Sequence, residues 1–368
     1  MPASEPLRRS IEVEYWVVDD EGYLVEPTGL VDATAGAERE FVEPLLEIKT
    51  TPCETTAELR DELLGRLGRV LRRADELDRG LVPLATPVHT EEIADLPSER
   101  TEIQDIVVGE DFEYVRHCAG THVHIEQLPG REVDQLNTLV ALDPALALAN
   151  SSPFFGGRHI AAGARSKLYR WLAYDDLDGQ GRLWPYVDDA GEWDTRLERR
   201  YEKFRLAAIE AGIDVRTVEE HFDPESAVWT PVQFREEFGT VEWRSPDATL
   251  PSDILRLADT ITNTVSQLEE TTVHIHGETG RRTDDTIVLP EFEAVQEYVN
   301  AAIRDGLGSD AVRSYLDRMG FDTDAYDPVA HDIDRPGTLS LADARELRLD
   351  YAQRLEDDVL GVRSLADD

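Results

Sequence analysis

The chain has 368 residues, of which 41% are hydrophobic, so it can bury a sizeable core and is not expected to be disordered. Its 77 acidic and 37 basic residues give a formal net charge of -40, which would repel a nucleic-acid backbone or an anionic membrane surface. We therefore expect neither nucleic acid nor a membrane among its partners.

Lysine occurs only at Lys49, Lys167 and Lys203, whereas Asp and Glu are spread along the whole chain. This pattern is typical of a salt-rich cytoplasm, because screening over about 3 Å at 1 M salt weakens repulsion between carboxylates. Most acidic residues are therefore interpreted as solvated surface. The two cysteines, and the lack of an apolar N-terminal segment or of about 18 consecutive apolar residues, predict a soluble cytoplasmic protein without disulfides, signal peptide or membrane span.

Strand-like and helix-like patterns alternate along the chain without regular βαβ spacing. The predicted elements are a hairpin over 11–25, a strand ending at 52, a helix over 57–79, a buried strand over 81–89, a strand over 121–126, helices over 132–149 and 194–212, strands within 227–247, and a helix over 250–270. For the first helix, Thr55 or Thr56 is the expected N-cap and Gly80 the stop. His276 opens a turn, HGETG, that is predicted to close a further hairpin.

These patterns predict an α+β fold with helices on one side of a sheet. We expect a single domain over 1–368, with a motif-bearing core over about 10–270 and a mostly helical part over about 285–368. The sequence contains no internal repeat, GxGxxG, P-loop or GxSxG segment, so nucleotide binding through those loops is not expected.

The segment GTHVHIE, residues 120–126, places His122, His124 and Glu126 on one face of a predicted strand. A single His-x-His pair more often consists of ordinary strand residues than of ligands. It becomes a site only if neighbouring strands bring carboxylates to the same face.

Three further strand segments carry such carboxylates. Glu12 and Glu14 alternate with apolar residues, Glu47 lies between Leu46 and Ile48, and Glu242 precedes Arg244 by two positions, with Glu40 and Glu43 just upstream of the second segment. Several carboxylates with few histidines suit magnesium or manganese better than zinc. For any one strand, however, a polar side turned to water is the favoured explanation.

Five short motifs occur together in a family-specific order: SIEVEYWVVD, LLEIKTTP, GTHVHIE, ALANSSPFFGG and GTVEWRSPD. In order and approximate spacing they resemble the glutamate-cysteine ligase type 2 (carboxylate-amine ligase) family, over about residues 10–251. The resemblance implies an α+β fold with a glutamine synthetase-like antiparallel catalytic sheet and helices packed on its outer side. It also implies an enzyme that can form a homodimer.

The resemblance further implies ATP-dependent amide-bond formation through an acyl phosphate, with glutamate and cysteine giving γ-glutamylcysteine as the expected pair, and with ATP and Mg2+ or Mn2+ as cofactors. By position in the motifs, the implied metal ligands are Glu12, Glu14, Glu40, Glu47, His122 and Glu242. The implied catalytic residues are Arg244 and Glu242, and the implied contacts to ATP or substrate are Lys49, His124, Asn150, Ser151, Ser152 and Arg165.

The chain departs from the family pattern in three places, one of which is the absence of the Asn-Lys/Arg-Trp-x-Ala motif that is common in the family's C-terminal helices. Pro231 and Gln233 stand where the family has Asp and Arg, with Arg235 displaced by two positions, and Arg165 matches its motif only if one residue is deleted. These departures fall where substrates and phosphates would be held and leave the expected metal ligands in place. Asn150 and its two serine neighbours are equally well explained as the turn that ends a helix.

Three alternatives to the cysteine ligase stay open. The chain could be a ligase for another amine, or a non-catalytic relative that binds ATP or a metabolite. A metallohydrolase is the third, because His274 and His276 form a second His-x-His pair. Ligand hardness favours the ligase over the hydrolase.

Overall fold

The computed structural model describes residues 6–90, 92–174, 177 and 179–366. Its strands are β1 (Arg9–Asp19), β2 (Ala37–Arg39), β3 (Leu45–Lys49), β4 (Arg79–Val82), β5 (Thr121–Glu126), β6 (Phe154–Phe155), β7 (Arg158–His159), β8 (Val232–Arg235), β9 (Thr240–Trp243), β10 (Thr272–Ile275), β11 (Arg281–Arg282) and β12 (Thr286–Leu289). Its α-helices are α1 (Thr56–Asp75), α2 (Glu99–Val108), α3 (Glu113–Arg116), α4 (Glu132–Leu142), α5 (Ala164–Lys167), α6 (Ala190–Glu210), α7 (Val215–His221), α8 (Pro224–Ala227), α9 (Pro251–Gln267), α10 (Phe292–Asp305), α11 (Asp310–Arg318), α12 (Val329–Ile333) and α13 (Leu341–Ala366).

A seven-stranded antiparallel sheet forms the centre of the molecule, with six strands in the order β2-β3-β1-β5-β9-β8 and β4 as a seventh strand paired with β1. The long strand β1 pairs along one edge with β5 through its first half and with β4 through its second half. This antiparallel arrangement with its covering helices confirms the predicted α+β fold.

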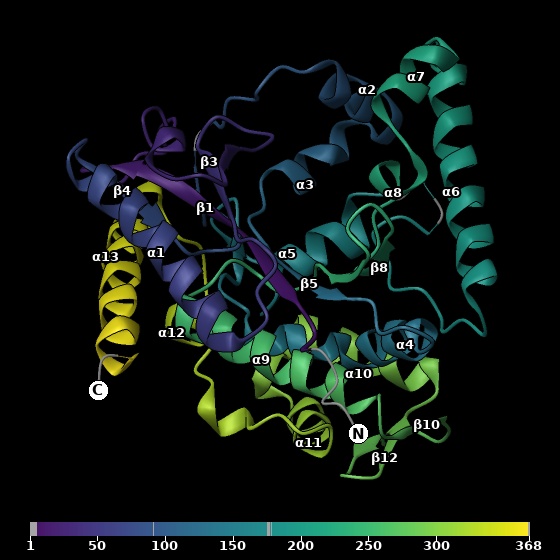
Figure 1. Cartoon of the computed structure of the whole chain (residues 1–368). Helices are drawn as coiled ribbons and strands as arrows, with labels where there is room; N and C mark the ends of the chain where they lie inside the picture. The colour runs from purple at the N-terminus through teal and green to yellow at the C-terminus, as the bar shows by residue number, and fades with distance from the viewer. Residues whose placement is uncertain (1–5, 91, 175–176, 178, 367–368) are drawn as a thin grey trace.

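One face of the sheet is buried against helices. Ile11, Val13 and Tyr15 alternate along β1 and are fully buried, because residues two apart in a strand share a face. Helices α1, α4, α9 and α13 pack on the sheet strands, and α1 and α13 lie side by side (Figure 1). Burial of this apolar face leaves the alternate residues of β1, including its glutamates, on the opposite face.

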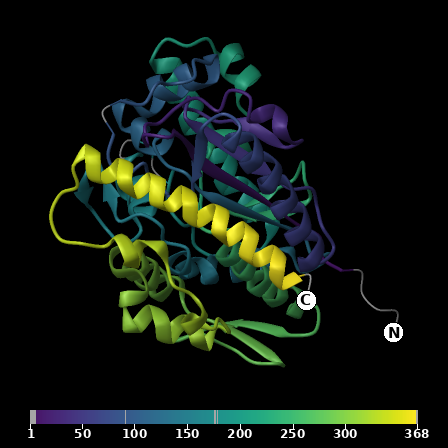
Figure 2. The same ribbon diagram turned by 90° about the vertical axis from the view of Figure 1, so that its left-hand side faces the viewer.

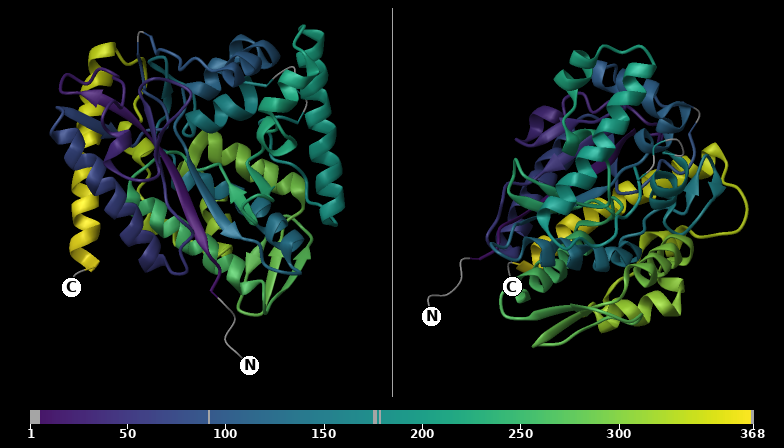
Figure 3. Two further views of the ribbon diagram at one scale, coloured as in Figure 1. Left: turned by 45° about the horizontal axis from the view of Figure 1, so that its top comes forward. Right: turned by 90° about the vertical axis from the view of Figure 1, so that its right-hand side faces the viewer.

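The opposite face is bordered by the segments from α2 to α3 and from α6 to α8, which lie on the far side of the sheet from α13 (Figures 1 and 3). Helix α6 packs against α2, α7 and α8. The sheet and this second group of helices therefore enclose the space above the β1 glutamates.

The C-terminal part consists of a small sheet, β10-β12-β11, followed along the chain by helices α10 to α13 (Figure 2). One large cluster of buried apolar residues extends from Leu7 to Val359 and so includes both the sheet-bearing part and the C-terminal helices. The single-domain organisation stays a prediction.

Several predicted boundaries differ from the structure. Thr55 is the N-cap of α1, with a capping box to Glu58, but the helix ends at Asp75 rather than near Gly80. Gly80 lies in β4, where an added Cβ would come within 3.0 Å of the Ala352 Cβ, so α13 can pack closely there. The helix predicted to reach residue 149 becomes a 3-10 segment from Asp143, because Pro144 has no N–H to donate.

One further prediction about strands was wrong. The hairpin predicted after His276 does not form, because β10 pairs with β12 in parallel and β11 pairs with the other edge of β12. Helix α2 lies between the strands predicted over 81–89 and 121–126, where no element was predicted. In the described residues, no helix combines the length and the apolar character that a membrane span requires.

Candidate active site

The strand register brings the predicted ligands onto one face of the sheet. The residues that lie opposite each other are Glu12 with His122, Glu14 with Glu47, and His124 with Glu242. Because the side-chain period of a strand is two, every one of these residues points to the same side. Antiparallel pairing thus gathers residues that are far apart in the sequence.

These side chains line a cavity of about 260 Å³ between the sheet and the helices above it. The predicted site residues in its lining are Glu12, Glu14, Glu40, Glu47, Lys49, His122, His124, Glu242 and Arg244. Apolar and aromatic side chains form much of the rest of the wall, including Tyr169, Tyr174 and Trp229. The cavity therefore has a charged floor and an aromatic wall.

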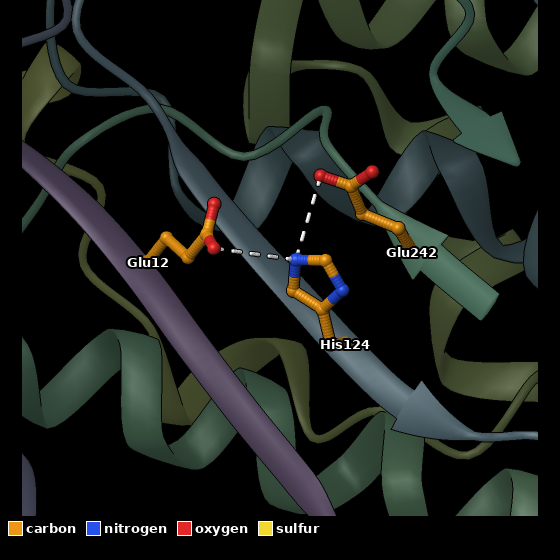
Figure 4. A group of neighbouring side chains, drawn as sticks. All are labelled: Glu12, His124 and Glu242. Atoms are coloured by element: carbon orange, nitrogen blue, oxygen red, sulfur yellow. Dashed lines mark ion pairs between the residues drawn. The ribbon is translucent and has the colours of Figure 1, made fainter. Parts of the chain in front are cut away.

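His124 lies between two carboxylates from the neighbouring strands (Figure 4). Its Nε2 is 3.8 Å from Glu12 Oε1 and 3.6 Å from Glu242 Oε1, and this buried nitrogen has no hydrogen-bond partner among the described residues. Its other nitrogen, Nδ1, is 3.2 Å from Thr240 Oγ1. A free, inward-facing nitrogen on a ring oriented through the other nitrogen is the usual arrangement of a metal-binding histidine.

His122 contacts the same two carboxylates. Its Nδ1 lies 3.3 Å from Glu12 Oε2 and 3.4 Å from Glu242 Oε1. Burial and the nearby Arg244 lower the pKa of His122 despite these carboxylates. The ring is therefore held in its neutral form, in which a nitrogen lone pair can bind a cation.

Glu14, Glu40 and Glu47 form a second group of carboxylates. Burial raises the pKa of Glu40 well above its usual value, and the neighbouring Glu47 and Glu14 raise it further. Burial likewise raises the pKa values of Glu14 and Glu47. Lys49 Nζ lies 2.9 Å from Glu47 Oε2 and so neutralises part of this charge.

Glu242 and Arg244 occupy the end of β9. Burial opposes the ionisation of Glu242, but the Arg244 guanidinium beside it holds its pKa down at about 2. Arg244 Nε is 3.4 Å from Glu242 Oε1, and this carboxylate raises the pKa of Arg244 even though burial disfavours its charge. Both groups are thus charged within the cavity.

The donor set fits hard divalent cations. Three groups of ligand atoms each lie within 4.8 Å of one another: Glu12, His124 and Glu242; Glu12, Glu47 and His122; and Glu14, Glu40 and Glu47. Mutually repelling carboxylates with an unpartnered imidazole nitrogen are the environment that Mg2+ or Mn2+ would neutralise.

The back of β9 is fixed by the fully buried Asp143. Its carboxylate accepts hydrogen bonds from Arg170 Nη1 at 2.6 Å, from Trp243 Nε1 at 2.9 Å, and from Ser245 Oγ. Trp243 and Ser245 alternate with Glu242 and Arg244, so they face away from the cavity. This network therefore fixes the strand whose other side carries the charged pair.

Arg165 lies behind the cavity floor and is not among the described residues that line it. Its Nη1 donates to the carbonyl oxygens of Arg244 and Ser245, both at 3.2 Å. An added Cβ on Gly120 would come 2.2 Å from Arg165 Nη2, so the glycine of GTHVHIE leaves room for this side chain. The structure gives Arg165 a supporting position, and direct contact with a substrate stays a prediction.

Asn150, Ser151 and Ser152 also lie outside the described cavity lining. Ser151 Oγ accepts a hydrogen bond from the Ala85 amide at 2.7 Å, and Ser152 Oγ lies 2.8 Å from Thr86 Oγ1. Asn150 Nδ2 donates to a carbonyl oxygen of α10. These contacts fit the helix-ending turn that the sequence also allowed, and a substrate contact stays a prediction.

The segment that departs from the family pattern supplies one cavity residue, Arg235, and one buried neighbour of the cavity, Gln233. On β8, Gln233 Nε2 donates to Glu242 Oε2 at 3.1 Å, and Arg235 Nη1 lies 3.5 Å from the same oxygen. A displacement of two positions keeps Arg235 on the same face of the strand. The period-two rule could have placed Arg235 in the site from the sequence.

The aromatic wall was not predicted. Tyr169 lies in a π-helical turn, Leu168–Leu172, in which the Ala173 amide donates to the Leu168 carbonyl. Trp229 lies in an irregular segment before β8, and its ring centroid is 4.5 Å from that of Tyr169. Neither segment has a regular apolar period that would have revealed its orientation.

The second histidine pair does not join this site. His274 and His276 are exposed at β10 and its end, in the small C-terminal sheet. Neither belongs to the ligand groups found among the described residues. The described residues therefore do not bring the two histidine pairs together in one metal centre, which was the basis of the metallohydrolase alternative.

Magnesium should stabilise the protein more strongly at pH 8 than at pH 5. The raised pKa values of Glu14, Glu40 and Glu47 mean that the folded state binds protons more tightly than the unfolded state. The contribution of these three carboxyl groups to the free energy of unfolding therefore falls as the pH rises above their pKa in the unfolded state, about 4.3. A divalent cation would relieve that repulsion. Thermal denaturation with and without MgCl2 at constant ionic strength measures the effect, and equal shifts at the two pH values would contradict it.

The fold and the site define an antiparallel sheet whose one face gathers carboxylates and imidazoles in a single cavity. A family model described as "Glutamate-cysteine ligase family 2(GCS2)" matches residues 10–339. The chain belongs to this family.

Two relatives illustrate the sequence similarity. The chain is 28% identical over 268 residues to a Chloroflexus aggregans protein named "Putative glutamate--cysteine ligase 2", and 27% identical to a protein of the same name from Chloroflexus aurantiacus J-10-fl. Each alignment covers 68% of this chain and 62% of the relative, so the similarity spans less than two thirds of the relatives' length.

Solved structures of two enzymes share the fold. A bifunctional glutathione synthetase from Pasteurella multocida matches with a TM-score of 0.58 and 14% identity, over 96% of this chain and 53% of that one. A glutamate–cysteine ligase from Francisella tularensis, in complex with AMP, matches with a TM-score of 0.53 and 13% identity, over 99% and 93% of the two chains.

Proposed function

We propose that the protein is an ATP-dependent carboxylate–amine ligase that joins glutamate to cysteine, giving γ-glutamylcysteine. The observation that carries the proposal is the set of carboxylates and imidazoles that four antiparallel strands bring into one cavity together with Arg244. Family membership supports the reaction class. Cysteine as the amine rests on the family resemblance alone.

The reaction has two steps that conserve all atoms. The γ-carboxylate of glutamate attacks the terminal phosphorus of ATP, forming a C–O–P bond and releasing ADP. The amine nitrogen then attacks the acyl carbon, the C–O bond breaks, and inorganic phosphate and a proton leave. Both steps concentrate negative charge on the transferred phosphoryl group.

The residues of the cavity match these demands. Arg244 is positively charged and buried, and its planar guanidinium suits contact with phosphoryl oxygens. Arg235 and Lys49 add positive charge at two other positions of the lining. His122 in its neutral form, together with His124 and the surrounding glutamates, would hold Mg2+, which when bound neutralises phosphate charge. The aromatic wall would exclude water from the acyl phosphate.

An ADP-release assay tests the proposal. With MgCl2, high KCl, ATP and glutamate, we expect the protein to release ADP and phosphate when cysteine is added, and much less when it is omitted. Turnover with a different amine would support the ligase reaction and show that cysteine is not the amine substrate. ATP binding without turnover across an amine panel would show a non-catalytic relative and refute the proposal.

We further infer that the enzyme works in a salt-rich cytoplasm. The net charge of -40 and the scarcity of lysine support this setting, and both cysteines are free and buried. The assay therefore belongs at molar KCl, where screening weakens repulsion among the surface carboxylates.

A further inference from the structure

Phe238 is an exposed aromatic residue at the edge of the cavity. It lines the cavity, yet its exposed fraction is 55%. The other aromatic residues of the described lining are buried or half-buried: Phe41, Phe112, Tyr169, Tyr174, Phe204 and Trp229. Phe238 therefore offers an open apolar surface to a ligand that enters the cavity.

The position of Phe238 is fixed by its backbone. It lies in the turn between β8 and β9, where its amide donates to the Arg235 carbonyl at 3.2 Å. The turn closes at Gly239, whose φ of 62° favours glycine. The Gly239 carbonyl accepts a hydrogen bond of 2.9 Å from the amide of Gln127, at the end of β5. The exposed ring is thus held on a hydrogen-bonded hairpin.

The ring is also adjacent to the proposed phosphate end of the cavity. Its centroid lies 5.9 Å from that of His124, with the two rings nearly perpendicular. His124 belongs to the ligand group that includes Glu12 and Glu242. The Arg235 guanidinium lies 5.5 Å from the Phe238 centroid and also reaches Glu242, so it links the ring to the charged floor.

We propose that Phe238 is the platform on which the nucleobase of the bound nucleoside triphosphate packs. This inference rests on the proposed function, because it takes the phosphates to bind beside His124, Glu12 and Glu242. A nucleotide consists of a polyanionic phosphate chain and a flat aromatic base. The cavity likewise places a cation-binding group, which would face the phosphates, next to an open aromatic ring, which would face the base. Stacking on a ring face does not read base edges, so the platform supplies affinity without selecting one base.

Nucleotide binding measured by titration calorimetry, with MgCl2 at high KCl, tests the inference. In Phe238→Ala we expect the Kd for ATP to rise roughly tenfold to a hundredfold, which is the range for loss of one base–aromatic stack. Inorganic tripolyphosphate has no base, so its Kd should be unchanged. Phe238→Tyr should restore ATP affinity, and Tyr23→Ala, which removes another exposed aromatic residue, should leave it unchanged.

An unchanged ATP affinity in Phe238→Ala, an equal loss of tripolyphosphate affinity, or the absence of ATP binding by the wild-type protein would each overturn the inference. A rise only in the KM for the amine would also overturn it and place the amine on this ring. Failure of the ligase proposal would give a different result, because wild-type protein would then bind ATP but release no ADP. The Kd values for ATP and tripolyphosphate could still be compared in that case.

Discussion

Glu242→Gln should lower the rate of amine-dependent ADP release by roughly 10²–10³-fold or more, because it removes a charge that the reaction requires. Glu242 is 2% exposed, and its carboxylate meets His122, His124 and Arg244. The amide is the same size but cannot act as an anionic ligand. It also leaves the Arg244 charge without its partner. Steady-state ADP release at saturating MgCl2 measures the effect.

Glu43→Gln is the matched control. Glu43 belongs to the same acidic stretch as Glu40 and Glu47 but is not among the described residues that line the cavity. We expect this variant to keep wild-type turnover. If Glu242→Gln is folded by circular dichroism and still turns over at the wild-type rate, Glu242 is not a metal ligand or a catalytic residue.

Asp143→Ala should lower the free energy of unfolding by about 3–5 kcal/mol, because it leaves the buried Arg170 charge uncompensated. The side chains of Asp143 and Arg170 are 0% and 4% exposed. The substitution also removes an acceptor from Trp243 and Ser245. Chemical denaturation at high KCl measures the loss.

Asp332→Ala supplies the comparison, since the Asp332–Arg354 pair has similar chemistry but both side chains are about 45% exposed. Removal of an exposed pair should cost only about 0–1 kcal/mol. The double variant Asp143→Ala/Arg170→Met should recover part of the loss, because no unpaired charge stays buried. Equal costs for Asp143→Ala and Asp332→Ala would show that burial of the first pair does not matter.

The sequence predicted the charged floor of the cavity because it depends on short-range rules. Alternation fixes which residues of a strand share a face. Glu12, Glu14, Glu47, His122 and Glu242 could therefore be assigned to one side of their strands before the strand order was known. The family resemblance then implied that these strands belong to one antiparallel sheet, and the structure gave their order.

The walls could not be predicted in the same way. Tyr169 enters the cavity from a π-helical turn, and Trp229 from an irregular segment, and neither conformation has a period that a sequence reveals. The supporting role of Arg165 depends on the space left by Gly120, which is a tertiary contact. Likewise, only the pairing of β10 with β12 excluded the hairpin predicted after His276.

The charged floor and the aromatic wall are carried by different kinds of segment. The floor belongs to paired strands, where a shift of one residue would turn every ligand away from the cavity. The wall belongs to turns and short helices, which can change in sequence without altering the strand register. If the proposed ligase reaction is correct, substrate choice in this scaffold would therefore diverge independently of the phosphate chemistry, and engineering of a new amine specificity would begin at the wall.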